Sequence, residues 1–365
     1  MREIKIVAYY LPQFHPIPEN DAWWGKGFTE WSNVSKAKPL FRNHKQPFLP
    51  GDFGFYDLRL HESQLQQVQL AKEHGVHGFC YWHYWFGNGK RILERPFNNV
   101  VANKSLDLPF CLAWANESWT GHWHGLDRNR MLVEQLYPGV ADYTQHFYAL
   151  LDAFKDERYI RVDGNLLFSI YRAMGSEDIP LFMEIWQKLA SEHDLGGFHF
   201  NAINSGTECL KLGFESFTSH APRVTIDMIE NNFMNRIFYR KYGYRLSDYL
   251  RNFPHHGPEI YQYKDLVKHN LNLKLHDSEI PVVTSCWDNT PRSQRKGLVL
   301  ENCSPELFAE YLKKAINKVD ENSYSDKIIF IKSWNEWAEG NVIEPSLDFG
   351  DSFLKNIKNI LNDCH

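Results

Sequence analysis

Several patterns that mark common protein classes are missing from this sequence of 365 residues. No hydrophobic run approaches the length that crosses a membrane, so no transmembrane segment is predicted. There is no Gly-x-Gly-x-x-Gly fingerprint and no P-loop, which weakens an interpretation as a nucleotide-binding protein. Positive charge is not in excess, because the formal net charge is −5, and this argues against nucleic acid as a partner. Since there is also no linker, repeat or low-complexity run, residues 1–365 are predicted to form one domain.

Cysteine and histidine patterns typical of disulfides or metal sites are also scarce. The six cysteines are scattered without Cys-x-x-Cys spacing, which predicts reduced and mostly buried thiols. His122 and His124 could supply two metal ligands, but no third ligand is fixed by spacing, so we expect no metal and no other cofactor. A strand-like run begins at Ile4 and leaves no room for a signal peptide, which predicts a cytoplasmic protein.

Apolar and aromatic residues are plentiful and recur in short blocks. Eight β-branched and aromatic runs are predicted to be buried strands, at residues 4–10, 78–82, 109–114, 166–171, 198–202, 216–219, 281–286 and 327–332. Helices are predicted at residues 58–74, 141–154, 180–193, 263–270, 305–319 and 351–361. This alternation predicts an α/β fold, a (β/α)8 TIM barrel with long loops on its C-terminal face. A doubly wound open sheet is the alternative.

Two stretches do not follow this alternation. Residues 11–57 form a long aromatic segment that is predicted to be a loop, and ordered loops of this length are usually functional. Glu30 and Trp31 lie in it and are counted among the candidate substrate-binding residues. Residues 222–258 are rich in Tyr, Arg and Asn and receive no assignment. The basic and aromatic run at residues 236–245 fits a solvated helix face; a lid over an anionic glycan, or a peripheral contact with a lipid-linked glycan, is the alternative.

The last predicted strand runs directly into Trp334-Asn335-Glu336-Trp337-Ala338-Glu339-Gly340. Carboxylates at the C-terminal tip of a barrel strand lie where barrel enzymes place their chemistry. Paired carboxylates framed by tryptophan suit the cleavage of glycosidic bonds, which uses one acid and one base or nucleophile. Glu336 and Glu339 are therefore the candidate catalytic residues.

Other predicted strands end in similar residues, which should converge on one face of the barrel. Aromatic rings suit the faces of sugars, and amides and carboxylates suit their hydroxyl groups. The predicted partner is therefore an oligosaccharide or polysaccharide. The candidate substrate-binding residues at the strand tips are Tyr10, Gln13, His83, Tyr84, Trp85, Trp114, Asn116, Glu117, Trp119, Trp287, Asp288, Asn289, Trp334 and Asn335. Cys286, next to Trp287, has no assigned base and is predicted to be a core thiol.

With these motifs assembled, the chain resembles the WbsX-like proteins of bacterial O-antigen and polysaccharide clusters, which are related to glycoside hydrolase family 99. The resemblance rests on motifs spread over nearly the whole chain: Tyr10-Leu11-Pro12-Gln13-Phe14-His15, Gly27-Phe28-Thr29-Glu30-Trp31, Gly78-Phe79-Cys80-Tyr81-Trp82-His83-Tyr84-Trp85, Trp114-Ala115-Asn116-Glu117, Trp287-Asp288-Asn289-Thr290 and Trp334-Asn335-Glu336-Trp337-Ala338-Glu339-Gly340.

The resemblance implies a barrel that acts on α-linked sugars, which in family 99 are endo-α-1,2-mannosides. Glu336 would take a proton from the 2-hydroxyl group of the sugar, which attacks C1 to form a 1,2-anhydro sugar. Glu339 would protonate the leaving oxygen and then activate water, with net retention. Many family members have histidine where this chain has Ala338, which bears on the identity of the substrate.

This division of roles carries two expectations for the structure. Residues three apart in a regular strand point to opposite faces, so the chain must leave the strand by Glu336, with Gly340 permitting the bend. An acid must remain protonated, so we expect a raised pKa for Glu339 and an ionised, hydrogen-bonded Glu336.

Three alternatives remain open from the sequence. The first is a glycosyltransferase of O-antigen or lipopolysaccharide biosynthesis, against which stands the lack of an Asp-x-Asp metal site. The second is a sugar-binding barrel without catalytic activity. The third keeps a hydrolase but makes Glu117 the acid and Glu336 a covalent nucleophile, as in ordinary retaining barrels.

Overall fold

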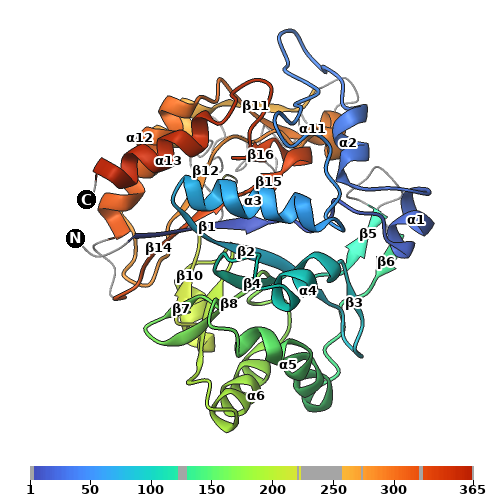
Figure 1. Cartoon of the computed structure of the whole chain (residues 1–365), viewed down its shortest axis with the longest axis vertical. Helices are drawn as coiled ribbons and strands as arrows, with labels where there is room; N and C mark the ends of the chain where they lie inside the picture. Colours follow the sequence, from blue (N-terminus) through green and yellow to red (C-terminus); the bar gives the residue numbers. More distant parts are fainter. Residues whose placement is uncertain are drawn as a thin grey trace, which may run out of the picture.

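A computed structural model of the chain describes residues 4–121, 130–219, 222, 257–272, 274–319 and 324–363. It is built around a strongly curled sheet with helices on its outside (Figure 1). Eight strands of this sheet run parallel, in the hydrogen-bonded order β10 (Ser216–Phe217), β9 (Phe198–Ala202), β8 (Asn165–Ile170), β4 (Phe110–Trp114), β2 (Val76–Trp85), β1 (Ile4–Tyr10), β14 (Lys327–Lys332) and β12 (Val282–Thr284).

All eight predicted strands are present. Neighbours in the sheet are also neighbours in the order of the eight strands along the chain, and the first of the eight pairs with the last. Strand β1 pairs with β2 on one side and with β14, the last of the eight, on the other. This is the strand order of a (β/α)8 barrel, whereas a doubly wound sheet reverses its order part-way. Two backbone hydrogen bonds, from Phe217 to Ser278 (3.1 Å) and from Ile280 to Phe217 (2.9 Å), link β10 at one end of the path to the segment before β12 at the other.

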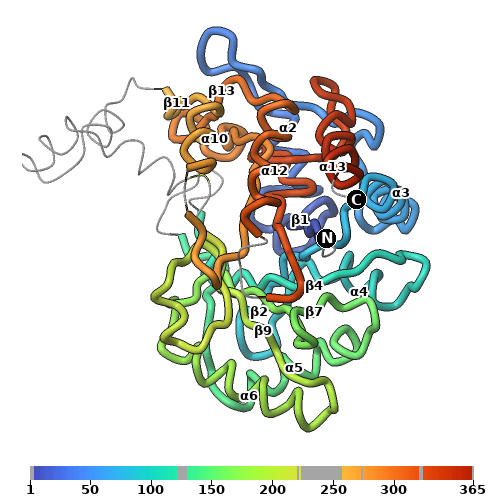
Figure 2. Tube along the Cα trace, turned by 90° about the vertical axis from the view of Figure 1, so that its left-hand side faces the viewer, coloured from blue at the N-terminus to red at the C-terminus, as the bar shows by residue number. Residues whose placement is uncertain are grey.

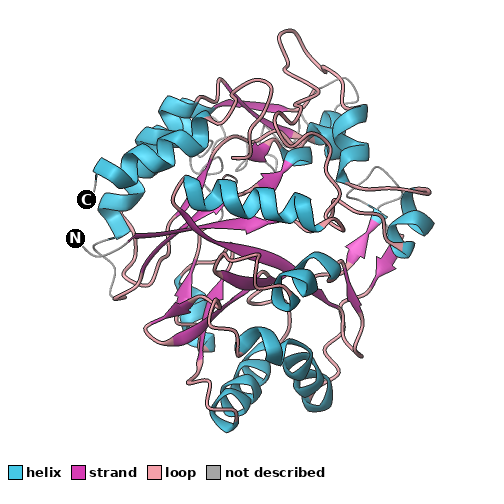
Figure 3. Ribbon diagram, in the orientation of Figure 1, coloured by secondary structure: helices cyan, strands magenta, loops and turns pink. Residues whose placement is uncertain are grey.

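The larger helices lie on the outside of the sheet, and the strands lie inside (Figure 3). They are α3 (His61–Glu73), α4 (Arg95–Ala102), α5 (Val140–Phe154), α6 (Ile179–Glu192), α10 (Tyr263–Asn272), α12 (Pro305–Val319) and α13 (Ser352–Asp363). Helix α12 begins with proline, which suits the first helical position, and it buries Phe308, Leu312 and Ala315 on one face. Helices α12 and α13 lie side by side (Figure 2).

The strands are mostly apolar because both of their faces are covered. Strand β14 has the sequence Lys-Ile-Ile-Phe-Ile-Lys, and its four central residues are at most 2% exposed. A parallel sheet covered by helices outside and filled by side chains inside leaves no solvent face for polar residues. Cys80, Cys111 and Cys209 are buried, while Cys286 and Cys303 are half-buried. None of the helices in the described ranges has the length and apolar character that a membrane crossing requires.

The segment predicted as a loop at residues 11–57 contains two helices, α1 (Pro18–Trp24) and α2 (Glu30–Lys36). Each has seven residues, too few to show helical periodicity, and both depend on contacts with the rest of the fold. Several short strands are additional to the eight parallel strands. They are β3 (Arg91–Ile92), which pairs with β2, β7 (Arg161–Val162), which pairs with β8, and two separate pairs: β5 (Trp119–Thr120) with β6 (Met131–Val133), and β11 (Glu259–Gln262) with β13 (Leu298–Glu301). The His122 and His124 segment and the run at 236–245 lie outside the described residues.

Candidate active site

The chain leaves β14 and turns so that Glu336 and Glu339 face the same space. Strand β15 (Asn335–Glu336) is followed at once by a 3-10 turn over Trp337–Glu339 and by β16 (Asn341–Val342), which pairs back on β15. Gly340 has φ of 60°, and a Cβ there would lie 3.0 Å from the backbone nitrogen of Asp288. Only glycine adopts this conformation without strain in so tight a space. The expected bend after Glu336 is therefore confirmed.

One guanidinium group joins both candidate catalytic residues to a third carboxylate. Arg292 lies in the short helix α11 (Thr290–Ser293). Its Nη2 donates to Glu336 at 2.9 Å, its Nη1 to Glu339 at 2.7 Å and its Nε to Glu30 at 3.1 Å. The side chains of Glu336 and Glu339 are 11% and 13% exposed, and that of Glu30 is 1% exposed. These four residues form the Arg292 cluster. Ion pairs in such a site are stronger than on the surface because little water screens them.

The electrostatics of this cluster differ from the expectation. Burial raises the pKa of Glu336 to about 8; Arg292 opposes the shift, and repulsion by Glu339 and Glu30 adds to it. The carboxyl group with the clearly raised pKa is therefore Glu336, whereas the sequence led us to expect Glu339. The main physical reason is burial, which disfavours the charged form of Glu336, and the two neighbouring carboxylates add a smaller repulsion.

Lysine 332, at the end of β14, is the second cation beside these carboxylates. Burial lowers its pKa, while attraction by Glu339 and Glu336 opposes the shift. Its ammonium group also lies 5.2 Å from the centre of the Trp287 ring, a distance at which the face of the indole attracts a cation.

The cluster forms part of the wall of a cavity of about 450 Å³, within the size range of small-molecule sites. Nine of the predicted site residues line it: Gln13, Glu30, Tyr84, Glu117, Trp119, Trp287, Asn289, Glu336 and Glu339. Strand tips from both halves of the sheet therefore contribute to one site. Glu117, the alternative acid, receives two hydrogen bonds from Arg172, at 2.9 and 2.7 Å.

The other nine predicted residues do not line this cavity: Tyr10, Trp31, His83, Trp85, Trp114, Asn116, Asp288, Trp334 and Asn335. Several are packed in the core behind it. The indole nitrogen of Trp114 donates to the backbone oxygen of Trp85 at 2.9 Å, and Trp85 stacks on His146 with ring centroids 4.4 Å apart. His146 in turn bonds to His83 at 2.7 Å.

The remaining members of this group support the loops that carry the site. Asn335 bonds to both backbone groups of Leu11, at 2.7 and 3.1 Å, and so ties the start of the turn over Trp337–Glu339 to the end of the first strand. The indole of Trp31 donates to the backbone of Tyr56 at 2.8 Å. Asn116 bonds to Arg172, the phenol of Tyr10 donates to Gln67, and Trp334 is fully buried.

Asp288 holds the cavity wall together from behind. Its carboxylate accepts hydrogen bonds from His44 and Gln46, both at 2.7 Å, and its backbone nitrogen donates to the backbone oxygen of Glu339 at 2.6 Å. One residue thereby joins the long segment after β1 to the turn over Trp337–Glu339. A second cavity of about 360 Å³ lies on this side and shares Trp287 with the first.

Sequence reasoning overlooked Arg292, Lys332, Trp82 and Tyr171, which all line the main cavity. Trp82 and Lys332 lie within predicted strands. Side chains alternate between the two faces of a strand, so one residue known to face the site could have indicated that these two face it as well. Arg292 follows the Trp287-Asp288-Asn289 motif, but its direction depends on helix α11, which is too short to predict. The described residues contain no group of three or more His, Cys, Asp or Glu side chains arranged to hold a metal ion.

Comparison with known families gives one match that covers most of the chain. The family model described as "Glycosyltransferase WbsX" matches residues 6–357. The chain belongs to the WbsX family. The protein WxcX of Xanthomonas campestris pv. campestris (strain B100) is 34% identical to it over 354 residues, and so is WxcX of strain ATCC 33913. These alignments cover 96% of the chain but 48% of WxcX, so the chain spans about half the length of these relatives.

Solved structures resemble this WbsX-family chain in fold. A protein described as glycoside hydrolase-like superimposes with a TM-score of 0.57 and 16% identity, over 99% of this chain and 94% of the other. The family 99 endo-α-mannosidase from Bacteroides thetaiotaomicron gives a TM-score of 0.54 and 13% identity, over 100% of this chain and 98% of the other. At these identities the likeness concerns the fold.

Proposed function

We propose that this WbsX-family chain is a glycoside hydrolase that cleaves an α-linked glycan, an α-mannoside or a related α-glycoside, with net retention. The observation that carries the proposal is that Glu336 and Glu339 face one cavity and bind the same guanidinium group. Two carboxyl groups held this way can both reach one glycosidic bond, as hydrolysis requires. The rings of Trp119 and Trp287 on the cavity wall offer faces for sugars.

The fold supports the same proposal. We propose that the eight-stranded sheet closes into a complete (β/α)8 barrel within one domain of residues 1–365, since backbone hydrogen bonds link β10 to the segment before β12. Barrel enzymes place catalytic residues after the C-terminal ends of their strands, where Glu336 and Glu339 lie. The likeness to an endo-α-mannosidase is the reason for choosing α-mannosides first.

In the reaction we propose, Glu336 takes the proton of the sugar 2-hydroxyl group while O2 attacks C1. The bond from C1 to the leaving oxygen breaks, and Glu339 gives that oxygen its proton. Water then attacks C1 of the 1,2-anhydro sugar, Glu339 takes a proton from the water, and Glu336 returns its proton to O2. The sum is one glycoside and one water converted to two sugars, with both carboxyl groups restored.

The charges of the Arg292 cluster fit this cycle. Glu30, Glu336 and Glu339 balance Arg292 and Lys332 when one of the three carboxyl groups keeps a proton. One proton shared between Glu336 and Glu339 is what an acid and a base together need. Burial raises the pKa of Glu336, so substrate binding has to move that proton toward Glu339. The 2-hydroxyl group near Glu336 and the leaving oxygen near Glu339 would direct this transfer.

The proposal is tested by incubating the protein with defined α-mannosides, beginning with α-1,2-mannobiose, and following the products by proton NMR. We expect release of mannose whose first-formed anomer is α. The double variant Glu336→Gln with Glu339→Gln is the matched control and should release none. Cleavage with inversion, or equal release by the double variant, would refute the mechanism.

A second candidate is a glycosyltransferase, which the description of the matching family favours. It would transfer a sugar from a donor to a glycan of polysaccharide assembly. Incubation with nucleotide sugars and an acceptor oligosaccharide separates the two, because a transferase releases the nucleotide while a hydrolase leaves it untouched. Nucleotide release that depends on Glu336 would favour this candidate over hydrolysis.

A further inference from the structure

Two hydroxyl groups on the wall of the main cavity have no hydrogen-bond partner in the part of the chain that the structure describes. They belong to Tyr9 and Thr218. Tyr9 is 3% exposed and Thr218 is 1% exposed, and both line the cavity. A buried polar group without a partner destabilises the folded state, which makes such groups rare in native proteins. A ligand that fills the cavity can supply the missing partner.

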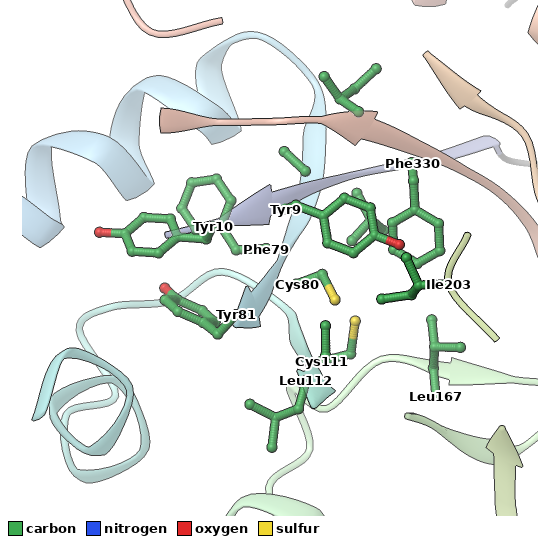
Figure 4. Packing of buried hydrophobic residues seen from close by; sticks show 14 of the residues in the cluster. Tyr9, Tyr10, Phe79, Cys80, Tyr81, Cys111, Leu112, Leu167, Ile203 and Phe330 are labelled. Carbon is green, nitrogen blue, oxygen red and sulfur yellow. The ribbon is translucent and has the colours of Figure 1, made fainter. Parts of the chain in front are cut away.

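The hydroxyl group of Tyr9 is held in a fixed position. Its ring stacks on Phe330, with centroids 4.8 Å apart and planes 15° from parallel, and on Trp82, at 5.4 Å and 17°. Figure 4 shows Tyr9 beside Phe330 on one side of β1, with Tyr10 on the other side next to Phe79 and Tyr81. A ring clamped in this way keeps its hydroxyl oxygen in one place, so the hydroxyl group can bond only to a partner that reaches it there. The unpaired position is therefore a property of the packing.

Thr218 follows β10, which is the end strand of the sheet, whereas Tyr9 lies in β1, further inside the strand order. Its backbone nitrogen donates to Ala202 at 2.8 Å, which extends the pairing of β10 with β9. Burial raises the pKa of Tyr9 well above its usual value, and the Thr218 hydroxyl group is the neighbour that opposes the shift. The two oxygens are thus near each other without completing a hydrogen bond.

This pair lies close to the candidate catalytic residues. Ala8 pairs with Ile331, so Tyr9 and Lys332 occupy the next position on adjacent strands. Lys332 lines the cavity and is attracted by Glu336 and Glu339. The rings of Tyr171 and Trp82 make a T-shaped contact, with centroids 5.8 Å apart and planes at 85°, and both rings line the same cavity. A sugar that binds beside the carboxyl groups would therefore also contact this part of the cavity wall.

We propose that Tyr9 and Thr218 form a subsite that binds one ring hydroxyl group of the sugar residue undergoing cleavage. The inference rests on the proposed function and adds to it a class of sugar: a neutral pyranose that keeps a hydroxyl group on the ring position facing into the barrel. The sugar hydroxyl group accepts a hydrogen bond from one protein hydroxyl and donates to the other. A sugar that is deoxygenated at this position leaves the pair unsatisfied and binds more weakly.

The adjacent tyrosines provide a matched test. Tyr9→Phe removes a hydroxyl group without a partner, so we expect an unchanged or higher melting temperature. Tyr10→Phe removes the 2.6 Å bond to Gln67 on the far side of β1, so we expect a lower melting temperature and unchanged glycan affinity. Dissociation constants are measured by NMR titration with the methyl α-glycosides of mannose, glucose, galactose and rhamnose. For those bound by the wild type, Tyr9→Phe should weaken binding roughly 10-fold, as the loss of one hydrogen bond predicts.

Deoxy sugars identify the hydroxyl group that is recognised. The 2-, 3-, 4- and 6-deoxy forms of the best-bound glycoside are titrated against the wild type, Tyr9→Phe and Thr218→Val. One of the deoxy sugars should bind the wild type and Tyr9→Phe with equal affinity, because it lacks the hydroxyl group that Tyr9 contacts. Tyr9→Phe with Thr218→Val should weaken binding by less than the product of the single effects, since both contact one sugar oxygen.

The outcomes separate this inference from the proposed function. If α-1,2-mannobiose is cleaved and Tyr9→Phe leaves KM unchanged, the subsite is refuted while the hydrolase stands. If glycosides bind, Tyr9→Phe weakens them and none is cleaved, the hydrolase fails while the subsite stands. A melting temperature that falls as far in Tyr9→Phe as in Tyr10→Phe, or a wild type that binds none of the glycosides, also overturns the inference.

Discussion

The carboxyl group of Glu344 accepts a hydrogen bond of 2.7 Å from the indole nitrogen of Trp337, the residue that follows Glu336. Glu344 also accepts from Gln67 at 2.6 Å and Tyr56 at 2.9 Å, and it is 1% exposed. It therefore fixes the 3-10 turn between the two candidate catalytic residues from behind. This residue lies eight positions after Glu336 and touches none of the cavity described above.

Below about pH 4.5, we expect Glu344→Gln to destabilise the fold by ~1–3 kcal/mol, because an amide cannot accept all three of these hydrogen bonds. Burial raises the pKa of Glu344 to about 7, so its protonated form favours the folded state. The wild type loses this advantage as pH rises from about 4.5 to about 7, by ~3 kcal/mol in total, and the variant does not. Urea unfolding at several pH values should show the stability difference between the two proteins shrinking over that range. A constant difference would show that Glu344 does not titrate there.

The division of roles between Glu336 and Glu339 predicts different losses on different substrates. Glu339→Gln should spare α-glycosides with an activated leaving group, which needs no proton, and should slow natural linkages by ~10²–10⁴. Glu336→Gln should slow both kinds. The measurement compares kcat/KM for a nitrophenyl α-mannoside and for α-1,2-mannobiose. Equal losses on both substrates in Glu339→Gln would show that Glu339 is not the acid.

The raised pKa of Glu336 predicts the alkaline limb of the pH profile. The proposed cycle needs the one proton that Glu336 and Glu339 share, so kcat/KM should fall as pH rises through about 8 and this proton is lost. Glu30→Gln removes a repelling carboxylate and should move this limb to lower pH. Asp107→Asn removes an equal charge from an exposed pair with Lys72 and should leave the limb in place. Activity that instead rises with pH through 8 would mean that this proton must leave before the reaction starts, and would contradict the shared-proton cycle.

A 2-fluoro sugar with an activated leaving group distinguishes the two hydrolytic routes. Replacing the 2-hydroxyl group disables the anhydro-sugar route, so we expect no stable adduct by intact-protein mass spectrometry. A covalent adduct on Glu336 would instead support the route in which Glu117 is the acid and Glu336 the nucleophile. Loss of the adduct in Glu336→Gln is the control that assigns its position.

The tryptophans divide into groove and core residues with opposite predicted effects. Trp119 and Trp287 are half-buried and line the cavity, so replacement by alanine should weaken glycan binding by ~1–2 kcal/mol and leave the fold intact. Trp114 is 1% exposed, and its replacement should cost ~3–5 kcal/mol of stability. Melting curves and glycan titration of each variant decide this. A Trp287→Ala protein that melts lower but binds normally would place Trp287 in the core.

The sequence by itself determined the eight strands, most of the larger helices and the bend at Gly340. These features depend on residues near one another in the chain: runs of apolar side chains, and a glycine placed where the backbone must turn. The pair Glu336 and Glu339 could be found for the same reason, because both belong to one short motif after one strand.

Only the tertiary structure decided which polar groups share a space. Arg292 and Glu30 are separated by 262 positions and meet through a 3.1 Å ion pair, which no local pattern encodes. The same holds for Tyr9 and Tyr10: neighbours in sequence, they point to opposite sides of β1, one toward the cavity and one into the core. The pKa of Glu336 is likewise set by charges and burial contributed by distant segments. Side-chain type can be read from the sequence, but which groups lie together and how far they are shielded from water depends on how the strands and loops come together.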